Sequence, residues 1–307
     1  MDELVAGISP RPGISHVVFD FDGTISWLRH GWPELMAGLF LEQIPTLSEG
    51  RVSRVPISAA EQGSSPSPPG EGEQSGPQLA NELRLCSALE QTIHDQIVDD
   101  ILSLNGKSSI YQMERCAQRV AEHGGPELEP ERMLRQYLGV LAKLVDERKE
   151  KVRRGAARPD EFVVHGARDL LQRLHGRGLV LVILSGTAEE QVKEEAELLG
   201  LAPFFGPHIY GSTADLMGSS KQAVIERLMR EEQLSGERLL SFGDGPVEIR
   251  LTKQTGGLAV GVASDEDHNG SGKLHAQKAA QLREAGADCL IADYRNPGRL
   301  IKTLFGS

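Results

Sequence analysis

Cysteine and basic charge are both scarce in this chain of 307 residues. Its three cysteines, Cys86, Cys116 and Cys289, are isolated and form no CxxC pair. We therefore expect reduced thiols, as in a cytoplasmic protein, rather than a disulfide framework or a thiolate zinc site. Lys and Arg number 33 against 44 Asp and Glu, which gives a formal net charge of −11. Proteins that track a phosphate backbone need clustered basic residues, so this balance argues against nucleic acid as a partner.

Long apolar runs are missing as well. No stretch approaches the length of a transmembrane helix, and the N-terminus lacks the charged and apolar segments of a signal peptide, so we expect no membrane partner. The motifs HExxH, GxSxG and CxxC do not occur. The segment 269–273 lacks the first glycine of a P-loop, which excludes nucleotide binding there. We predict no metal site at His268 and His275, which flank this turn.

Apolar segments of strand length recur along the chain. The first covers residues 16–20, and the others follow Pro159, at 179–184, 208–210, 238–242, 258–262 and 288–292. Helical spacing of apolar residues separates these later segments. An alternation of strands and helices implies parallel crossovers. We therefore predict an α/β fold whose core is a Rossmann-like, doubly wound parallel sheet.

A helical block interrupts this pattern after the first strand. The spacing of apolar residues predicts helices over 25–44, 79–104, 109–123 and 130–154. Between the first two helices, residues 45–78 are rich in Ser, Pro, Gly and Glu, so they cannot bury enough apolar surface to offset the entropy of ordering. We predict that this segment is disordered. The domains are then a core of residues 1–24 and 160–307 and an all-helical insertion of residues 25–159.

Polar, glycine-containing loops follow three of the predicted strands. Asp20 and Asp22 follow the first strand, Ser185 the second, and Asp244 a later one, while Lys221 begins a helix in between. Because the carboxyl ends of parallel strands meet at one edge of the sheet, we expect these side chains to lie together.

Each of these groups has a use in phosphoryl transfer, in which catalysis is mostly positioning and charge neutralisation. The Ser185 hydroxyl, with nearby backbone N–H groups, can hold phosphate oxygens. Lys221 supplies a fixed positive charge. Asp20, the backbone carbonyl of Asp22 and Asp244 offer hard oxygen ligands, which suit Mg²⁺.

Four motifs in this order resemble those of the haloacid dehalogenase-like (HAD) superfamily in its phosphatase form. They are DFDGT at residues 20–24, an apolar strand that ends in serine, a lysine, and a strand that ends in Gly-Asp with an acid four residues after that Asp. The resemblance implies a phosphoaspartyl mechanism with Mg²⁺. Asp20 would attack phosphorus, and Asp22 would protonate the leaving alcohol and then activate water. Glu248, the last acid, is more often Asp in this superfamily, and we expect it to orient a metal-bound water.

The helical insertion falls where this superfamily carries a C1-type cap, as in its phosphoglycolate phosphatase-like branch. The resemblance therefore implies a lid that excludes water and contacts a small substrate. The candidate substrate contacts lie near the predicted site or in the insertion: Thr24, Gly186, Arg29, His30, Lys107 and Gln112. Trp32 is more simply explained by core packing of the cap.

These observations predict a Mg²⁺-dependent phosphatase that hydrolyses a small phosphorylated metabolite, such as a sugar phosphate or a phosphoglycolate-like acid. Two alternatives are left open. One is a phosphomutase that uses the same aspartyl phosphate, and the other is a non-catalytic relative that binds a phosphorylated ligand. The sequence identifies neither the substrate nor the oligomeric state.

Overall fold

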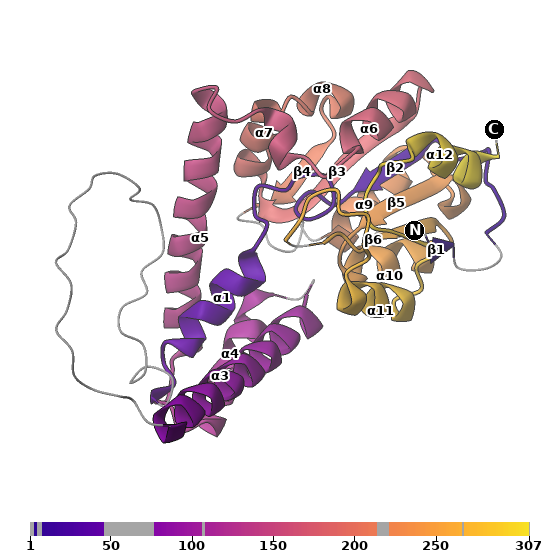
Figure 1. Cartoon of the computed structure of the whole chain (residues 1–307). Helices are drawn as coiled ribbons and strands as arrows, with labels where there is room; N and C mark the ends of the chain where they lie inside the picture. Colours follow the sequence, from indigo (N-terminus) through magenta and orange to yellow (C-terminus); the bar gives the residue numbers. More distant parts are fainter. Residues whose placement is uncertain are drawn as a thin grey trace. The chain divides into compact units, whose positions relative to one another are not determined.

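A computed structural model gives the fold of the chain (Figure 1). It describes residues 3–4, 8–45, 77–105, 108–213, 221–265 and 267–306, with the backbone alone for residues 3–4 and 77–87. The segment 46–76, which contains most of the predicted disordered stretch, lies outside the described residues, as does Lys107. The prediction of disorder therefore stays a prediction.

A twisted sheet forms the centre of the fold. Among the described residues it has seven strands in the order β1-β7-β6-β5-β2-β3-β4. Their bounds are β1 Glu3–Leu4, β2 His16–Phe19, β3 Val180–Ala188, β4 Ile209–Ser212, β5 Leu239–Gly243, β6 Leu258–Val262 and β7 Cys289–Ile291. Strand β1 pairs antiparallel with β7, and all other neighbouring strands are parallel. Strand β2 lies between β3 and β5, with His16 opposite both Val180 and Leu239.

Helices cover both faces of this sheet (Figure 1). They are α6 Ala167–Gly176, α7 Glu189–Leu198, α8 Ala202–Phe205, α9 Lys221–Glu231, α10 Pro246–Gln254, α11 Ala276–Glu284 and α12 Pro297–Phe305, with 3₁₀ turns η1 Pro159–Phe162 and η2 Gly236–Arg238. Successive strand residues point to opposite faces. In β2, Val17 and Phe19 accordingly pack with α6, α7, α8 and α12, whereas Val18 packs with α9. The predicted doubly wound α/β fold is confirmed.

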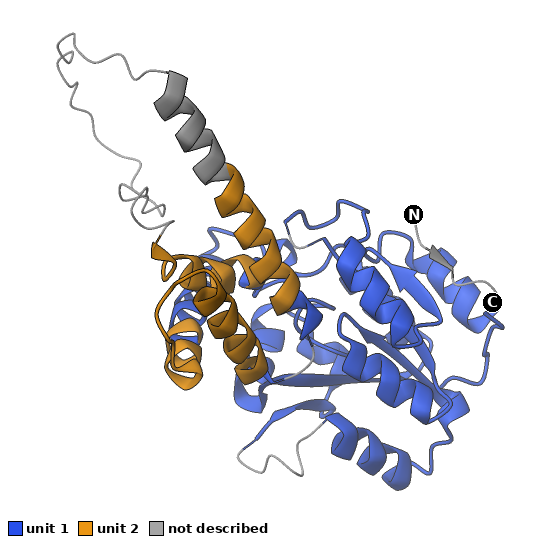
Figure 2. Cartoon of the chain, turned by 90° about the horizontal axis from the view of Figure 1, so that it is seen from below, with its two compact units in different colours: residues 1–32, 102–108, 138–307 blue, residues 33–101, 109–137 orange. Residues whose placement is uncertain are grey.

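The chain divides into two compact units (Figure 2). Unit 1 comprises residues 1–32, 102–108 and 138–307, and unit 2 comprises residues 33–101 and 109–137. The helices of the insertion are α1 Trp32–Leu41, α3 Pro77–Ser103, α4 Ser109–Glu122 and α5 Pro130–Arg153. The second half of α5 groups with the sheet, and there Lys149 donates a 2.8 Å hydrogen bond to Glu194 of α7. Within unit 2 the helices bury Phe40, Ile97, Met113, Val120 and Tyr137.

The segment after the first acidic loop differs from the sequence prediction of a helix over residues 25–44. Residues 25–31 form a loop, and the helix begins only at Trp32. The backbone N–H groups of Ile25 and Ser26 both donate to Phe21 O (3.0 and 2.8 Å), and Ser26 bridges to Val163. The contact with Val163 is long-range, and it is extended by the hydrogen bond from Trp27 N–H to Phe162 O (2.8 Å), which keeps the loop against the sheet unit in place of a continued helix.

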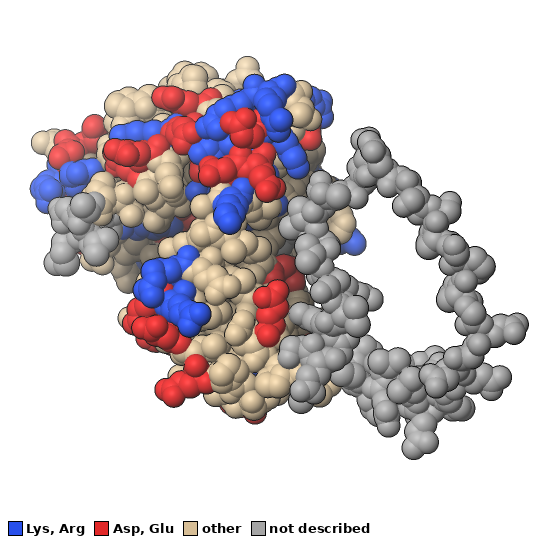
Figure 3. All heavy atoms as spheres, turned by 90° about the vertical axis from the view of Figure 1, so that its left-hand side faces the viewer, with Lys and Arg blue, Asp and Glu red and all other residues tan. Residues whose placement is uncertain are grey.

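Charged side chains of both signs are interspersed on the face shown in Figure 3. Elsewhere, charged residues form exposed ion pairs along one helix, as Arg173 does with Asp169 at 2.8 Å in α6. Each pair of this kind contributes about 0–1 kcal/mol, so these contacts say little about stability. Among the described residues, no helix combines the length and the apolar character needed to cross a bilayer.

Candidate active site

Asp20 follows β2 directly and lies at the carboxyl edge of the sheet, with only 8% of its surface exposed. Its backbone N–H donates to Phe242 O of the neighbouring strand β5 (2.9 Å). The Oδ1 atom accepts a hydrogen bond from the Phe21 amide (2.8 Å) and lies 2.9 Å from Lys221 Nζ at the start of α9. The carboxylate is therefore fixed through one oxygen, and Oδ2 has no hydrogen bond to any described residue.

Lys221 connects Asp20 to a second buried acid. It also forms an ion pair with Glu248, which is 4% exposed. Burial raises the pKa of Asp20 well above its usual value, Lys221 opposes this rise, and the charges of Glu248 and Asp244 add to it. Burial disfavours the ammonium of Lys221, but Asp20 and Glu248 raise its pKa above the usual value. A nearby positive charge stabilises the ionised form of carboxylates whose pKa is raised by burial and by neighbouring acids. The cluster is therefore electrostatically suited to bind a cation.

The loop after Asp20 closes against Asp244, which follows β5. Gly23 has a φ of +74°, a conformation that L-residues with a side chain rarely adopt. A Cβ atom there would lie 2.3 Å from Asp244 Oδ2, so only glycine fits. Thr24, which is fully buried, donates from Oγ1 to Asp244 Oδ1 at 3.5 Å, and Ser264 Oγ donates to Gly23 O at 3.1 Å. These contacts hold the two acidic loops together.

Asp22 is fixed by donors from two separate segments. Arg29 Nη1 donates to its Oδ1 atom at 2.7 Å. Thr187 Oγ1 and Ser185 Oγ, both on β3, donate to its Oδ2 atom at 2.8 and 3.4 Å. The Ser185 oxygen also accepts the Thr187 backbone N–H at 3.0 Å, and the Ser185 residue is 2% exposed. The structure thus brings Ser185 to Asp22, and it does so from within a strand rather than from a loop.

Arg29 is held in turn by a buried acid on α7. Its Nη1 and Nη2 atoms donate to the two carboxylate oxygens of Glu195 at 2.6 and 2.9 Å. Glu195 is 1% exposed. Burial raises the pKa of Glu195, although the hydrogen bonds and the charge of Arg29 work in the opposite direction. Burial opposes the charge of Arg29, but Asp22 and Glu195 raise the pKa of Arg29 above its usual value. Arg29 therefore bridges the sheet unit's α7 to Asp22.

His30 is engaged by the protein on both ring nitrogens. Arg148 of α5 donates from Nη2 to His30 Nε2 (3.0 Å), so Nε2 carries no proton. The Nδ1 atom therefore carries the proton and donates to Trp27 O (2.7 Å). Trp27 stacks on the imidazole ring at 3.8 Å. This tautomer fixes the loop before α1. A contact of His30 or Arg29 with a substrate stays a prediction.

The other candidate substrate contacts lie in different surroundings. Gly186 is exposed in β3. Gln112 is 3% exposed in unit 2 and donates from Nε2 to Ile101 O (3.0 Å), an internal bond between α4 and α3. Lys107 lies outside the described residues. Their roles toward a substrate also stay predictions.

A lysine that the sequence analysis did not single out lies at Asp244. Lys278 of α11 is 1% exposed, and its Nζ atom donates to Asp244 Oδ2 at 3.2 Å. Its backbone N–H donates to His275 Nδ1 (3.4 Å), which caps the helix. The site therefore contains two ammonium groups, the partly buried Lys221 beside Asp20 and the buried Lys278 beside Asp244.

Glu195 and Lys278, which the sequence analysis did not single out, share a recognisable feature of the sequence. In α7 the buried positions are Val192, Glu195 and Ala196, and in α11 they are Lys278, Ala279 and Leu282. A charged residue thus occupies the apolar stripe of each helix, where the 3.6-residue period calls for a hydrophobic side chain. Buried charges are paired or functional, so such positions merit attention in a sequence.

The donors at this edge of the sheet fit a hard divalent cation. Asp20 and Asp244 offer carboxylate oxygens, and Glu248 Oε2 is buried with no hydrogen-bond partner among the described residues. Oxygen ligands of this kind are those that Mg²⁺ prefers. An orphaned buried carboxylate oxygen is costly unless a cation or a water completes it.

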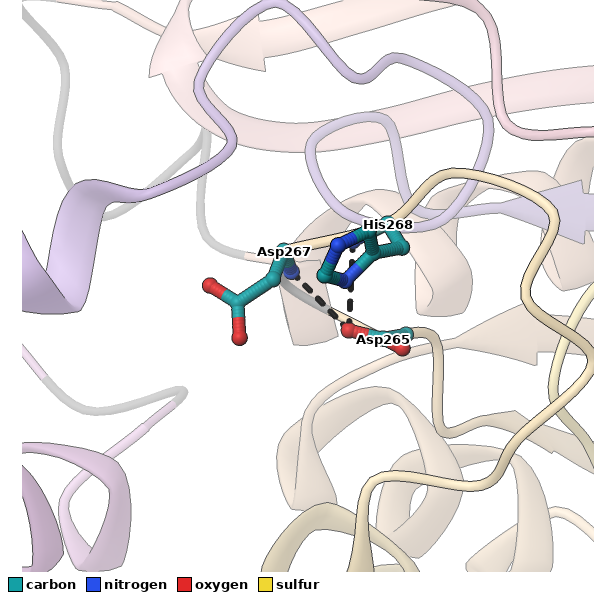
Figure 4. A group of neighbouring side chains, drawn as sticks. All are labelled: Asp265, Asp267 and His268. Carbon is teal, nitrogen blue, oxygen red and sulfur yellow. Dashed lines mark hydrogen bonds between the residues drawn. The ribbon is translucent and has the colours of Figure 1, made fainter.

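A second acidic group lies apart from these residues. Asp265, Asp267 and His268 each offer one ligand atom within 4.8 Å of the others (Figure 4). Asp265 Oδ1 accepts the backbone N–H groups of Asp267 (2.9 Å) and His268 (3.2 Å), which is an ordinary turn stabilised by an aspartate side chain. These bonds account for Asp265 without a cation.

The doubly wound sheet, with acids gathered at its carboxyl edge, defines an α/β enzyme of the kind in which ligands bind at that edge. The model of the haloacid dehalogenase-like hydrolase family matches residues 14–256. The chain therefore belongs to this family of hydrolases, as its motifs predicted. None of the curated proteins compared with the chain matches it.

Solved structures share the fold at low identity. A haloacid dehalogenase-like protein from Agrobacterium tumefaciens is 18% identical, with a TM-score of 0.52 and coverage of 94% of this chain and 97% of that one. A predicted phosphoglycolate phosphatase from Haemophilus somnus is 12% identical, with a TM-score of 0.50 and coverage of 96% and 99%. A β-phosphoglucomutase from Clostridium difficile is 13% identical, with a TM-score of 0.50 and coverage of 94% and 96%. At such low sequence identity, the structural similarity establishes a common fold and nothing further.

Proposed function

We propose that the protein is a Mg²⁺-dependent phosphatase that transfers a phosphoryl group from a small phosphorylated metabolite to Asp20 and then to water. The observation that carries this proposal is the state of Asp20. One of its oxygens is 2.9 Å from Lys221, and the other has no hydrogen bond to a described residue. Such a carboxylate is held in place through one oxygen while the other remains available to react, as a nucleophile requires.

In the proposed first step, Asp20 Oδ2 attacks phosphorus. The new oxygen–phosphorus bond forms as the bond to the alcohol oxygen breaks, and protonated Asp22 gives its proton to that oxygen. In the second step, Asp22 takes a proton from water, whose oxygen attacks phosphorus. This releases inorganic phosphate and restores the carboxylate of Asp20. Ser185 and Lys221 are suited to hold the phosphoryl oxygens, because one offers a hydroxyl donor and the other a fixed charge.

A Mg²⁺ ion would be held by Asp20, the backbone carbonyl of Asp22 and Asp244, with Glu248 reached through a water. When bound, the ion neutralises charge on the phosphoryl oxygens. The buried Oε2 atom of Glu248, which has no hydrogen bond within the described part of the chain, supports this ligand set.

We infer a sugar phosphate or a phosphoglycolate-like acid as the substrate class and the cytoplasm as the compartment. A helical insertion between the first two motifs supports a small substrate, because a cap excludes water best around a compact ligand. The same chemistry serves a phosphomutase if the phosphoryl group returns to the sugar instead of passing to water, and the products distinguish these outcomes.

The test is phosphate release from a panel of phosphorylated sugars and carboxylic acids, with MgCl₂ and again with a chelator. Asp20→Asn should abolish release. Asp169→Asn is a matched control, since Asp169 is an exposed acid that pairs with Arg173 along α6. Release by Asp20→Asn would remove the nucleophile assignment, and full activity in chelator would remove the metal. An isomeric phosphate ester in place of free phosphate would identify a mutase.

A further inference from the structure

Lys278 of α11 forms a buried ion pair with Asp244, which follows β5. Lys278 is 1% exposed, and its Nζ atom is 3.2 Å from Asp244 Oδ2. Burying an ammonium group is costly, so this charge is retained only where a carboxylate compensates it. The partner here is an acid that also belongs to the proposed metal ligands.

The charges of the cluster are nearly balanced by protein groups alone. Asp20, Asp244 and Glu248 supply three buried carboxylates, while Lys278 supplies a buried ammonium group and Lys221 a partly buried one. A divalent cation that binds the same carboxylates must approach both ammonium groups. Like charges at such short range in a partly buried site repel strongly, because little water screens them.

The two lysines differ in what they touch. Lys221 contacts Asp20, the proposed nucleophile, and would face the phosphoryl group. Lys278 arises from α11 and contacts Asp244 Oδ2, the same oxygen against which Gly23 packs. A substrate-facing charge explains Lys221 and does not explain Lys278.

We propose that Lys278 is an internal counter-ion that holds Asp244 in the metal-free protein and lowers the affinity of the site for its divalent cation. This inference rests on the proposed function, because it needs a cation at Asp244. The ammonium satisfies the carboxylate when no cation is bound, so the site stays assembled. It also repels the incoming cation, so binding remains reversible.

The experiment measures cation binding directly, by isothermal titration calorimetry with MgCl₂ on the full chain. Lys278→Met removes the charge and keeps much of the side-chain volume, and it should lower the dissociation constant at least about tenfold. Lys278→Arg retains the charge and should bind within about threefold of wild type. Lys253→Met is a matched control: Lys253 contacts Asp288 at 2.7 and 2.8 Å, a pair outside the site, and its loss should leave Mg²⁺ affinity unchanged.

Thermal unfolding gives a second readout that does not depend on activity. Without Mg²⁺, Lys278→Met should melt below wild type, because Asp244 has lost its ammonium partner. Saturating Mg²⁺ should raise the melting temperature of this variant by more than it raises that of wild type, since tighter binding stabilises more. Lys278→Gln provides the same comparison if the methionine variant does not fold.

The outcomes separate this inference from the function on which it rests. Unchanged or weaker binding in Lys278→Met, beside wild type that binds Mg²⁺, overturns the role of Lys278 and leaves the phosphatase intact. Equal binding by wild type and Asp244→Asn overturns it as well, because the cation then lies elsewhere. A wild type that binds no Mg²⁺ overturns both the metal site and the inference.

Discussion

Replacing Glu195 by glutamine should slow catalysis at Asp22 without weakening substrate binding. Glu195 is 1% exposed and accepts both terminal nitrogens of Arg29, at 2.6 and 2.9 Å. Arg29 in turn donates a 2.7 Å hydrogen bond to Asp22 Oδ1, so Glu195 fixes the position of Asp22 through Arg29. Glutamine can accept from only one of the two guanidinium nitrogens, because its NH₂ group faces the other. Arg29 would then lose its fixed position, and Asp22 one of its supports.

The size of the effect follows from the burial of the pair. Removing one partner of a buried ion pair costs about 3–5 kcal/mol when the other charge is left alone. Arg29 keeps its contact with Asp22, so we expect a smaller loss of about 2–3 kcal/mol, at or below the lower limit of that range. For a domain of this size, this lowers the melting temperature by roughly 5–10 °C. A misplaced acid or base slows turnover about ten- to a hundredfold.

The assay is steady-state hydrolysis of p-nitrophenyl phosphate, or of the best ester in the panel, with thermal unfolding alongside. We expect kcat to fall and KM to stay within about twofold, because Arg29 donates its hydrogen bonds to Asp22 and Glu195 rather than to a substrate. Glu194→Gln is the matched control on the same helix. Glu194 is about half exposed and pairs with Lys149 at 2.8 Å, away from Asp22, so its loss should change neither kcat nor KM.

Two results would refute this reasoning. Unchanged kcat in Glu195→Gln, with the expected loss of stability, would show that Asp22 does not depend on Arg29. A raised KM with unchanged kcat would instead assign Arg29 to substrate binding, as the sequence analysis expected.

Three further outcomes are expected. Gly23→Ala places a Cβ atom 2.3 Å from Asp244 Oδ2 and strains a φ of +74°, so it should lower both the melting temperature and phosphate release by more than Gly31→Ala, where no atom lies within 4 Å. Burial works to raise the pKa of Asp293, but hydrogen bonds from Arg295 hold it below the usual value. The Asp293–Arg295 pair therefore stabilises the fold above the unfolded pKa and loses this effect as pH falls through the folded pKa, and acid unfolding curves of Asp293→Asn should lack this component. Burial raises the pKa of the Cys116 thiol to about 12, so peptide mapping after iodoacetamide treatment at pH 8 should find it modified only in unfolded protein.

The strands of the core could be predicted closely because each is a short apolar run between turn residues. Strand β6 covers residues 258–262, as predicted. Strand β1, of two residues, carries no pattern long enough to be recognised. The apolar spacing that predicted a helix from Ile25 is real, but Ile25 and Leu28 are fully buried in the core of the sheet unit. Spacing alone does not reveal whether an apolar residue faces a helix partner or a sheet.

The acids at the carboxyl edge could be predicted because parallel topology brings strand ends together. Asp20, Lys221 and Asp244 meet as expected in the structure, although their chemical roles remain proposals. Glu195 and Lys278 could not be predicted as members of the site. Each comes from the body of a helix, so its meeting with the site depends on helix packing that no local pattern encodes.

The position of β2 in the sheet also determines when the protein can fold during synthesis. This strand begins at residue 16, yet its two neighbours are residues 180–183 and 239–242. At a translation rate of about 5–20 residues per second, strand β2 waits at least about ten seconds for its second neighbour. During that time the backbone of β2 has no neighbouring strand on one or both sides, a state that favours chaperone binding or aggregation. The helices α3, α4 and α5 of the insertion are synthesised within this interval, and helices form from local contacts, so they can form before the sheet is complete.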